Sequence, residues 1–145
     1  MPSSTEPFDP RTAYPLAENR PDLVKTARGL GLGEVNVANL VAGLLDQSDM
    51  RITAEGLKLQ AEVARAAGRA CLAENFERGA ELVAVPDDVL LATYELLRPG
   101  RARSSDDLRE RAQSLRRDYR AERVAALLEE AASVYEKRGL FRRRF

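Results

Sequence analysis

The chain has 145 residues, of which 44% are hydrophobic and 32% are charged, and its formal net charge at pH 7 is zero. This length and composition fit one ordinary soluble domain and exclude a wholly disordered polymer. The chain has no histidine and one cysteine, Cys71. Without histidine it lacks the side chain most used for proton transfer near neutral pH, and one thiol allows neither an internal disulfide nor a thiolate metal cluster. We therefore expect no catalytic or metal site in this chain alone, and a reducing, cytoplasmic location.

Membrane insertion and export are both disfavoured by the pattern of apolar residues. No run approaches the roughly 18 consecutive apolar residues of a membrane-spanning helix. Residues 1–10 lack the basic region and the apolar region of a secretory signal. We expect the chain neither to cross a membrane nor to be exported.

Charge is distributed unevenly along the chain. Residues 1–97 hold 9 basic and 15 acidic side chains, whereas residues 98–145 hold 14 basic and 8 acidic ones. A basic end can bind nucleic acid, but phosphate would repel the acidic first two-thirds, and acids are interspersed in the basic part. We expect a protein partner and no nucleic acid. A nucleic-acid-binding regulator is the least favoured alternative, and it would use Arg116, Arg117, Arg120 and the arginines at 142–144.

The first 21 residues contain five of the seven prolines. Proline fixes φ and donates no backbone hydrogen bond, so this composition predicts an extended arm over residues 1–21, followed by a single helical domain over residues 22–145. Tyr14 and Leu16 place apolar groups on a stiff backbone that is suited to lying in a partner's groove. A disordered tail is the alternative interpretation of the arm.

Hydrophobic periodicity after the arm predicts an all-α fold with about four helices, at residues 35–46, 53–84, 86–97 and 104–139. Thr53 can cap the second helix, and Ser104 with Asp107 has the spacing of a capping box. The glycine-rich run 29–33 lacks the spacing of a phosphate-binding loop and is interpreted as a turn.

Two of these helices are unusually long. About 32 helical residues at 1.5 Å each span roughly 48 Å, whereas a compact domain of this size should be about 38 Å across. Either the long helices break, with Gly56, Gly68 and Gly79 as possible break points, or the protein is elongated. On the alanine-rich face of residues 53–84, we expect Cys71 to be a small buried residue and Phe76 to belong to the core.

Several short motifs, in a fixed order, resemble one family. The motifs are Tyr14-Pro15-Leu16-Ala17, Val24-Lys25-Thr26, Asp49-Met50-Arg51-Ile52-Thr53, Leu59-Gln60-Ala61, Ala67-Gly68-Arg69, Asn75-Phe76-Glu77-Arg78, Ala80-Glu81-Leu82, Ala84-Val85-Pro86-Asp87-Asp88, Leu97-Arg98-Pro99 and Ala131-Ala132 with Tyr135. Together they resemble the small (gamma) subunit of adenosylcobalamin-dependent diol and glycerol dehydratases.

This resemblance implies a complex of large (alpha), medium (beta) and small subunits, with two copies of each, that converts a 1,2-diol or glycerol to an aldehyde with loss of water. It also implies that adenosylcobalamin supplies radical chemistry from sites on the larger subunits, so this chain binds no cofactor. The implied location is the cytoplasm, with enclosure in a bacterial microcompartment left open. The preference for a diol or for glycerol stays open, and so does the alternative of a helical adaptor unrelated to dehydratases.

Six residues are the candidate contacts with a partner. Arg51, Arg69 and Arg78 are forked donors suited to bidentate pairing with carboxylates, although pairing within a helix explains them equally well, because Arg78 follows Glu74 by four residues. The other candidates supply apolar groups. They are Tyr14, Leu16 and Pro86.

Overall fold

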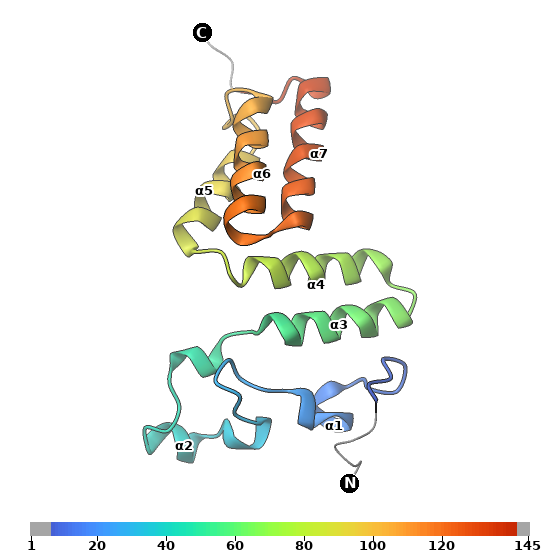
Figure 1. Cartoon of the computed structure of the whole chain (residues 1–145), viewed down its shortest axis with the longest axis vertical. Coiled ribbons are helices and arrows are strands. Elements are labelled where there is room, and N and C mark those ends of the chain that lie inside the picture. Colours follow the sequence, from blue (N-terminus) through green and yellow to red (C-terminus); the bar gives the residue numbers. More distant parts are fainter. Residues whose placement is uncertain (1–6, 142–145) are drawn as a thin grey trace. The chain divides into compact units, whose positions relative to one another are not determined.

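The computed structural model describes residues 7–141, and its regular elements are helical (Figure 1). The exception in this range is an isolated antiparallel bridge between Lys25 and Gly31. The predicted all-α fold is therefore confirmed. The α-helices and the 3₁₀ turns (η) are, in chain order, α1 Leu16–Asn19, η1 Pro21–Leu23, η2 Leu32–Glu34, α2 Val37–Val41, η3 Gln47–Met50, α3 Ala54–Ala66, α4 Ala70–Leu82, α5 Asp87–Leu97, α6 Ser105–Tyr119 and α7 Glu122–Arg138.

The chain divides into two compact units, the first ending at Ala80 and the second beginning at Glu81. Whether each unit folds alone is a separate property, so the single domain predicted for residues 22–145 stays a prediction. The extended arm predicted for residues 1–21 lies partly outside the described residues. In its described part, Ala13 N–H donates to the Asp9 carbonyl at 3.1 Å and α1 follows, so the arm is not extended throughout.

The helix predicted over residues 53–84 is broken at Gly68, so α3 and α4 lie side by side (Figure 1). Gly68 has φ +74°, in the left-handed region that a residue without Cβ adopts readily. The Gly68 N–H donates to the Arg65 carbonyl at 3.0 Å, and the Arg69 N–H donates to the Ala64 carbonyl at 2.8 Å. This pair of hydrogen bonds is that of a Schellman motif. Of the three possible glycine breaks, the structure selects this one.

The helix predicted over residues 104–139 is also broken, at Arg120, so that α6 and α7 form a hairpin (Figure 1). Arg120 has φ +54° and is the one non-glycine residue with positive φ among residues 7–141. No glycine or proline stands at this turn, so residue type carried no signal for it. The prediction of about four helices with two long ones was therefore wrong in number. The reason is that helix periodicity continues across a reversal that occupies only two or three residues.

Two smaller predictions also differ from the structure. The helix predicted at residues 35–46 is reduced to α2, which has five residues. Ser104 precedes α6, but its side chain makes no capping bond, and Asp107 Oδ2 instead accepts from Arg103 N–H at 2.8 Å. Thr53 does cap α3, since its hydroxyl accepts from Gly56 N–H at 3.1 Å.

The two units have unequal cores. In the first unit the buried cluster on α3 and α4 consists of Ala61, Ala64 and Ala73, with Phe76 packed against it as predicted. Cys71 is exposed, so its predicted burial was wrong; an alanine-rich helix shows no sharp boundary between inner and outer faces. The second unit is built on larger side chains. Its two buried clusters are Val85, Ala112, Leu115, Ala121, Val124, Ala125 and Leu128, and Ala102, Leu108 and Ala132.

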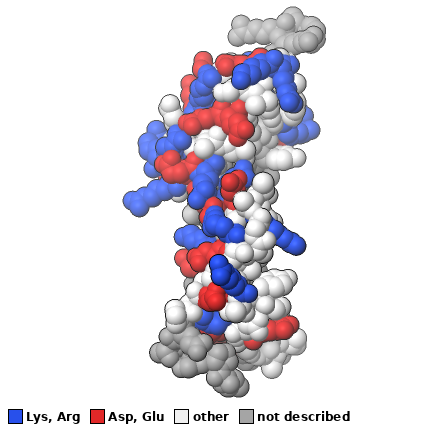
Figure 2. All heavy atoms as spheres, turned by 90° about the vertical axis from the view of Figure 1, so that its right-hand side faces the viewer, with Lys and Arg blue, Asp and Glu red and all other residues white. Residues whose placement is uncertain are grey.

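Ion pairs cover the outside of the second unit. Arg116 joins Glu122 at 2.7 Å and Glu129 at 2.9 Å, and Arg117 joins Asp118 at 2.8 Å. On the face drawn in Figure 2, basic and acidic side chains are interspersed over this unit instead of forming a uniformly basic patch. Two of the arginines that motivated the nucleic-acid alternative are therefore paired with carboxylates. The arginines at 142–144 lie outside the described residues.

Glu81 caps the start of α7 within the second unit. Ala121, the residue before α7, has no side-chain acceptor for the helix N–H groups. The two carboxylate oxygens of Glu81 accept from Arg123 N–H at 3.0 Å and from Val124 N–H at 2.9 Å. A negative charge that satisfies two orphan donors at a helix N-terminus stabilises the helix. Residue 81 thus performs the task that a capping residue at 121 would normally perform.

The Glu81→Ala variant should lose about 1 kcal/mol of unfolding free energy, the usual effect of removing a helix cap. Urea denaturation followed by circular dichroism measures this loss. Glu130→Ala, which removes an exposed carboxylate from α7, is the matched control. Equal stability of the two variants would show that the Glu81 contacts contribute nothing.

Candidate protein-binding surface

The first unit carries a groove of about 1070 Å³ with a mainly apolar lining. Its walls come from the segment around Tyr14, from residues 23–35, and from α3 and α4. The structure brings four of the six predicted contact residues to this groove. They are Tyr14, Leu16, Arg51 and Arg69.

Tyr14 stands outward from a fixed backbone. The Asn19 side-chain amide donates to the Tyr14 carbonyl at 2.8 Å and to the Thr12 carbonyl at 3.2 Å, which ties α1 to the preceding turn. Tyr14 is nevertheless 72% exposed, while Leu16 is half-buried. An aromatic ring held in water on an ordered backbone is typical of an interface anchor, because little further ordering is needed for it to bind.

The three candidate arginines differ in their surroundings. Arg51 and Arg69 are exposed, and neither side chain forms an ion pair within residues 7–141. Arg78 lies 3.9 Å from Glu74 and donates to Asn75 Oδ1 at 3.0 Å, as the intrahelical interpretation predicts. Of the three candidate arginines, Arg51 and Arg69 are therefore the two that lie at the groove and can pair with a partner's carboxylates.

Pro86 belongs to the second unit and is not among the residues that line the groove. It is exposed and directly precedes α5. Its backbone carbonyl accepts from Leu90 N–H at 2.9 Å, so its role within the chain is to start a helix.

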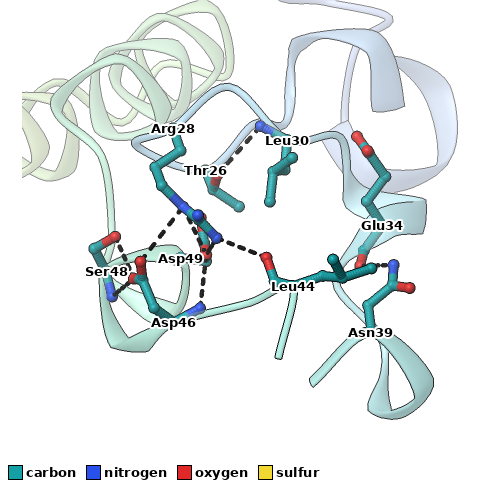
Figure 3. A network of polar contacts seen from close by, with 9 residues as sticks. All are labelled: Thr26, Arg28, Leu30, Glu34, Asn39, Leu44, Asp46, Ser48 and Asp49. Carbon is teal, nitrogen blue, oxygen red and sulfur yellow. Dashed lines mark hydrogen bonds and ion pairs between the residues drawn. The ribbon is translucent and has the colours of Figure 1, made fainter. Parts of the chain in front are cut away.

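A cluster of polar contacts centred on Arg28 holds the loop between α2 and α3 (Figure 3). Arg28 Nε lies 3.0 Å from both carboxylate oxygens of Asp49, and its Nη2 also donates to Asp49. The same Nη2 donates to the Leu44 carbonyl at 2.9 Å, and Asp46 N–H donates to Asp49 Oδ2 at 3.0 Å. We call the set Arg28, Asp46, Ser48, Asp49 and the Leu44 carbonyl the Arg28 cluster. It connects residue 28 to residues 44–49, which are up to 21 residues away in the chain.

Asp49 is the buried member of this cluster, and its side chain is shielded completely from solvent. Hydrogen bonds from the Arg28 guanidinium and from the Asp46 backbone N–H favour the carboxylate and hold the pKa of Asp49 well below its ordinary value of 3.8, despite desolvation. Asp46 also has a lowered pKa, because the Ser48 hydroxyl and N–H donate to it. The cluster therefore requires both aspartates in the ionised form.

Replacing Asp49 with asparagine should change the pH dependence of stability. A carboxylate whose folded-state pKa is lowered stabilises the fold above its unfolded-state pKa, near 3.8, and this contribution is lost as the pH falls. Wild type should exceed Asp49→Asn in unfolding free energy at pH 7, and the difference should shrink from about pH 5 downward. Urea denaturation between pH 7 and pH 3 measures it.

Glu62→Gln is the control for this experiment, because Glu62 is exposed on α3. Its stability should track that of wild type across the series. A difference between wild type and Asp49→Asn that stays constant with pH would contradict the assigned role of the Asp49 carboxylate.

The sequence did not indicate that the apolar residues around α2 belong to the candidate protein-binding surface. Periodicity places five side chains on one face of the predicted helix, Val37, Leu40, Val41, Leu44 and Leu45, but it cannot show whether that face meets the chain's own core. Of these five, Leu45 is buried. The other four are 50–83% exposed. The available signal was the absence of charge from residue 35 to residue 45.

Metal and membrane sites have no support in the part of the chain that the structure covers. Among residues 7–141, no three side chains of the types that bind metals come together. No helix in this range is both long and apolar enough to span a bilayer.

Comparison with known proteins gives a consistent result. A sequence model of the family described as dehydratase small subunit matches residues 10–142. The propanediol dehydratase small subunit of Citrobacter freundii is 47% identical over 127 residues, which cover 88% of this chain and 73% of the relative. The propanediol dehydratase small subunit of Salmonella typhimurium strain LT2 is 46% identical over 125 residues, covering 86% and 72% of the two chains.

Proposed function

The chain belongs to the dehydratase small-subunit family, and from this premise we propose that it is the non-catalytic small subunit of a propanediol dehydratase complex. The observation that carries the proposal is the family match, which extends over residues 10–142. Both relatives are named as small subunits of propanediol dehydratase, and a small subunit implies larger partner subunits. The proposed reaction of the complex is the conversion of a 1,2-diol to an aldehyde with loss of water.

In this proposal, chemistry and assembly belong to different chains. Adenosylcobalamin, bound by the larger subunits, supplies the radical chemistry of the complex. This chain has no histidine, the imidazole ligand most often used for transition metals, so its side chains do not fit a cobalt-binding role. Its proposed task is to assemble and stabilise the larger subunits, with two copies of each of the three chains in the complex.

The first unit is the part that we propose makes most of these contacts. Of the twelve large apolar side chains that are exposed among residues 7–141, nine lie in this unit. Its buried cluster is made of three alanines, so little of its apolar surface is covered from within. Exposed apolar surface of this kind on a folded chain marks a site of protein association.

Co-expression with the large and medium subunits of a propanediol dehydratase tests the proposal. The three chains should co-elute in gel filtration, and the complex should dehydrate propane-1,2-diol only when adenosylcobalamin is added. A small subunit that elutes alone, or that self-associates into a stable helical oligomer, would instead support a helical adaptor. The proposed location is the cytoplasm, and neighbouring shell-protein genes would indicate a microcompartment.

Truncation of the N-terminal segment should separate dispensable residues from docking residues. Deleting residues 1–12 should leave assembly intact, whereas deletion through Ala17 should weaken it, because the second deletion removes Tyr14 and Leu16 from the groove. Gel filtration of the co-expressed subunits measures the amount of assembled complex. Equal behaviour of the two truncations would show that the Tyr14 region does not dock.

A further inference from the structure

The segment from Val35 to Leu45 is an apolar hook that contains no charged residue. It includes α2, whose apolar side chains Val37 and Val41 are 75% and 83% exposed. Leu40 and Leu44 add two more side chains, at 50% and 61% exposure. Leu45, at 7% exposure, is buried in the unit and anchors the hook. The hook thus presents an uncharged and mainly apolar stretch of chain to water.

Polar contacts hold the backbone of the hook at both ends. Asn36 Oδ1 accepts from Asn39 N–H at 2.9 Å and caps α2, while the Asn39 amide donates to the Glu34 carbonyl at 2.7 Å. At the other end, Arg28 Nη2 donates to the Leu44 carbonyl at 2.9 Å (Figure 3). Because these bonds order the backbone before any partner arrives, binding requires little further loss of conformational freedom.

We infer that the apolar hook docks into an uncharged apolar groove on a larger subunit of the dehydratase, an inference that rests on the proposed function. The absence of charge over eleven residues excludes a charged partner surface, since a partner's charge would be desolvated there without an opposite charge. Binding in an apolar groove removes the apolar side chains of the hook from water, and this burial stabilises the complex.

Area favours a larger subunit over a second copy of this chain. The four exposed side chains of the hook present on the order of 400 Å² of apolar surface, the size of patch that marks an interaction site. Two hooks packed on each other would bury only about 800 Å² in total, which is the range of crystal contacts rather than of stable interfaces. A stable contact therefore needs surface beyond the hook.

The groove supplies that additional surface. Leu32, which precedes the hook, Val35, its first residue, and Ile52, beyond its end, all line the groove. The hook and the groove lie in the same compact unit and share these bordering residues. One larger subunit that covers both would bury a standard-sized interface, with the hook as its apolar part.

The test uses the full chain co-expressed with the large and medium subunits. Val41→Glu places a charge on the most exposed side chain of the hook, so the fold is retained, and circular dichroism verifies this. Gln113→Glu, which puts the same charge on an exposed position of α6, is the control. Val41→Glu should lower the recovery of the small subunit on tagged larger subunits at least tenfold, and Gln113→Glu should leave it unchanged.

A photo-crosslinking residue at position 41 gives an independent readout, and it should join this chain to a larger subunit. If wild type co-elutes with the larger subunits but Val41→Glu co-elutes equally well, the docking role of the hook is overturned and the proposed function stands. If wild type itself fails to co-elute, the proposed function fails. A crosslink from position 41 to a second copy of this chain would show that the hook binds that copy and not a larger subunit.

Discussion

Two reversals of the chain, at Gly68 and at Arg120, are the constraint on which the rest of the structure depends. Each residue adopts positive φ and ends a helix, so that a periodicity of more than 30 residues becomes two shorter helices. The reversals bring Ala61 and Ala64 onto Ala73 in the first unit and pair α6 with α7 in the second. Without them, these apolar faces would not meet within one chain.

The two hairpins bury very different amounts of apolar surface. In the second unit, Leu108, Leu115 and Leu128 are fully buried, and hydrophobic stabilisation grows with buried area. In the first unit, the buried cluster on α3 and α4 consists of three alanines, which remove little area from water. Polar contacts also connect parts of the first unit, among them the Arg28 cluster and the Arg65–Glu77 ion pair at 2.6 Å.

This difference agrees with the division of labour proposed for a small subunit. The proposal assigns surface for assembly to this chain, whose relatives are named as dehydratase subunits, and assigns the chemistry to its partners. The second unit carries its own core, while the first keeps its apolar side chains exposed on an ordered backbone. In the proposed assembly, the larger subunits would cover the apolar side chains that the first unit leaves exposed.

The sequence identified some residues of the candidate protein-binding surface and missed others. The Tyr14 segment was identified because proline stiffens the backbone and aromatic rings anchor interfaces. Arg51 and Arg69 were identified by residue type, but only the structure distinguished them from Arg78, which pairs within its own helix. The apolar hook was missed, because an apolar face has the same periodicity whether it meets its own core or a partner.

The amino-acid sequence was enough to predict the helical class, the family and the lack of histidine chemistry, because composition, periodicity and motif order are local or countable properties. It also determined individual caps such as Thr53, whose hydroxyl reaches an N–H three residues away. The three-dimensional structure was needed to show where the long helices reverse and at which of the three glycines the helix over residues 53–84 breaks. It was also needed to show that Glu81 caps a helix that begins more than 40 residues later. These outcomes depend on contacts between residues far apart in the chain, and no local pattern encodes such contacts.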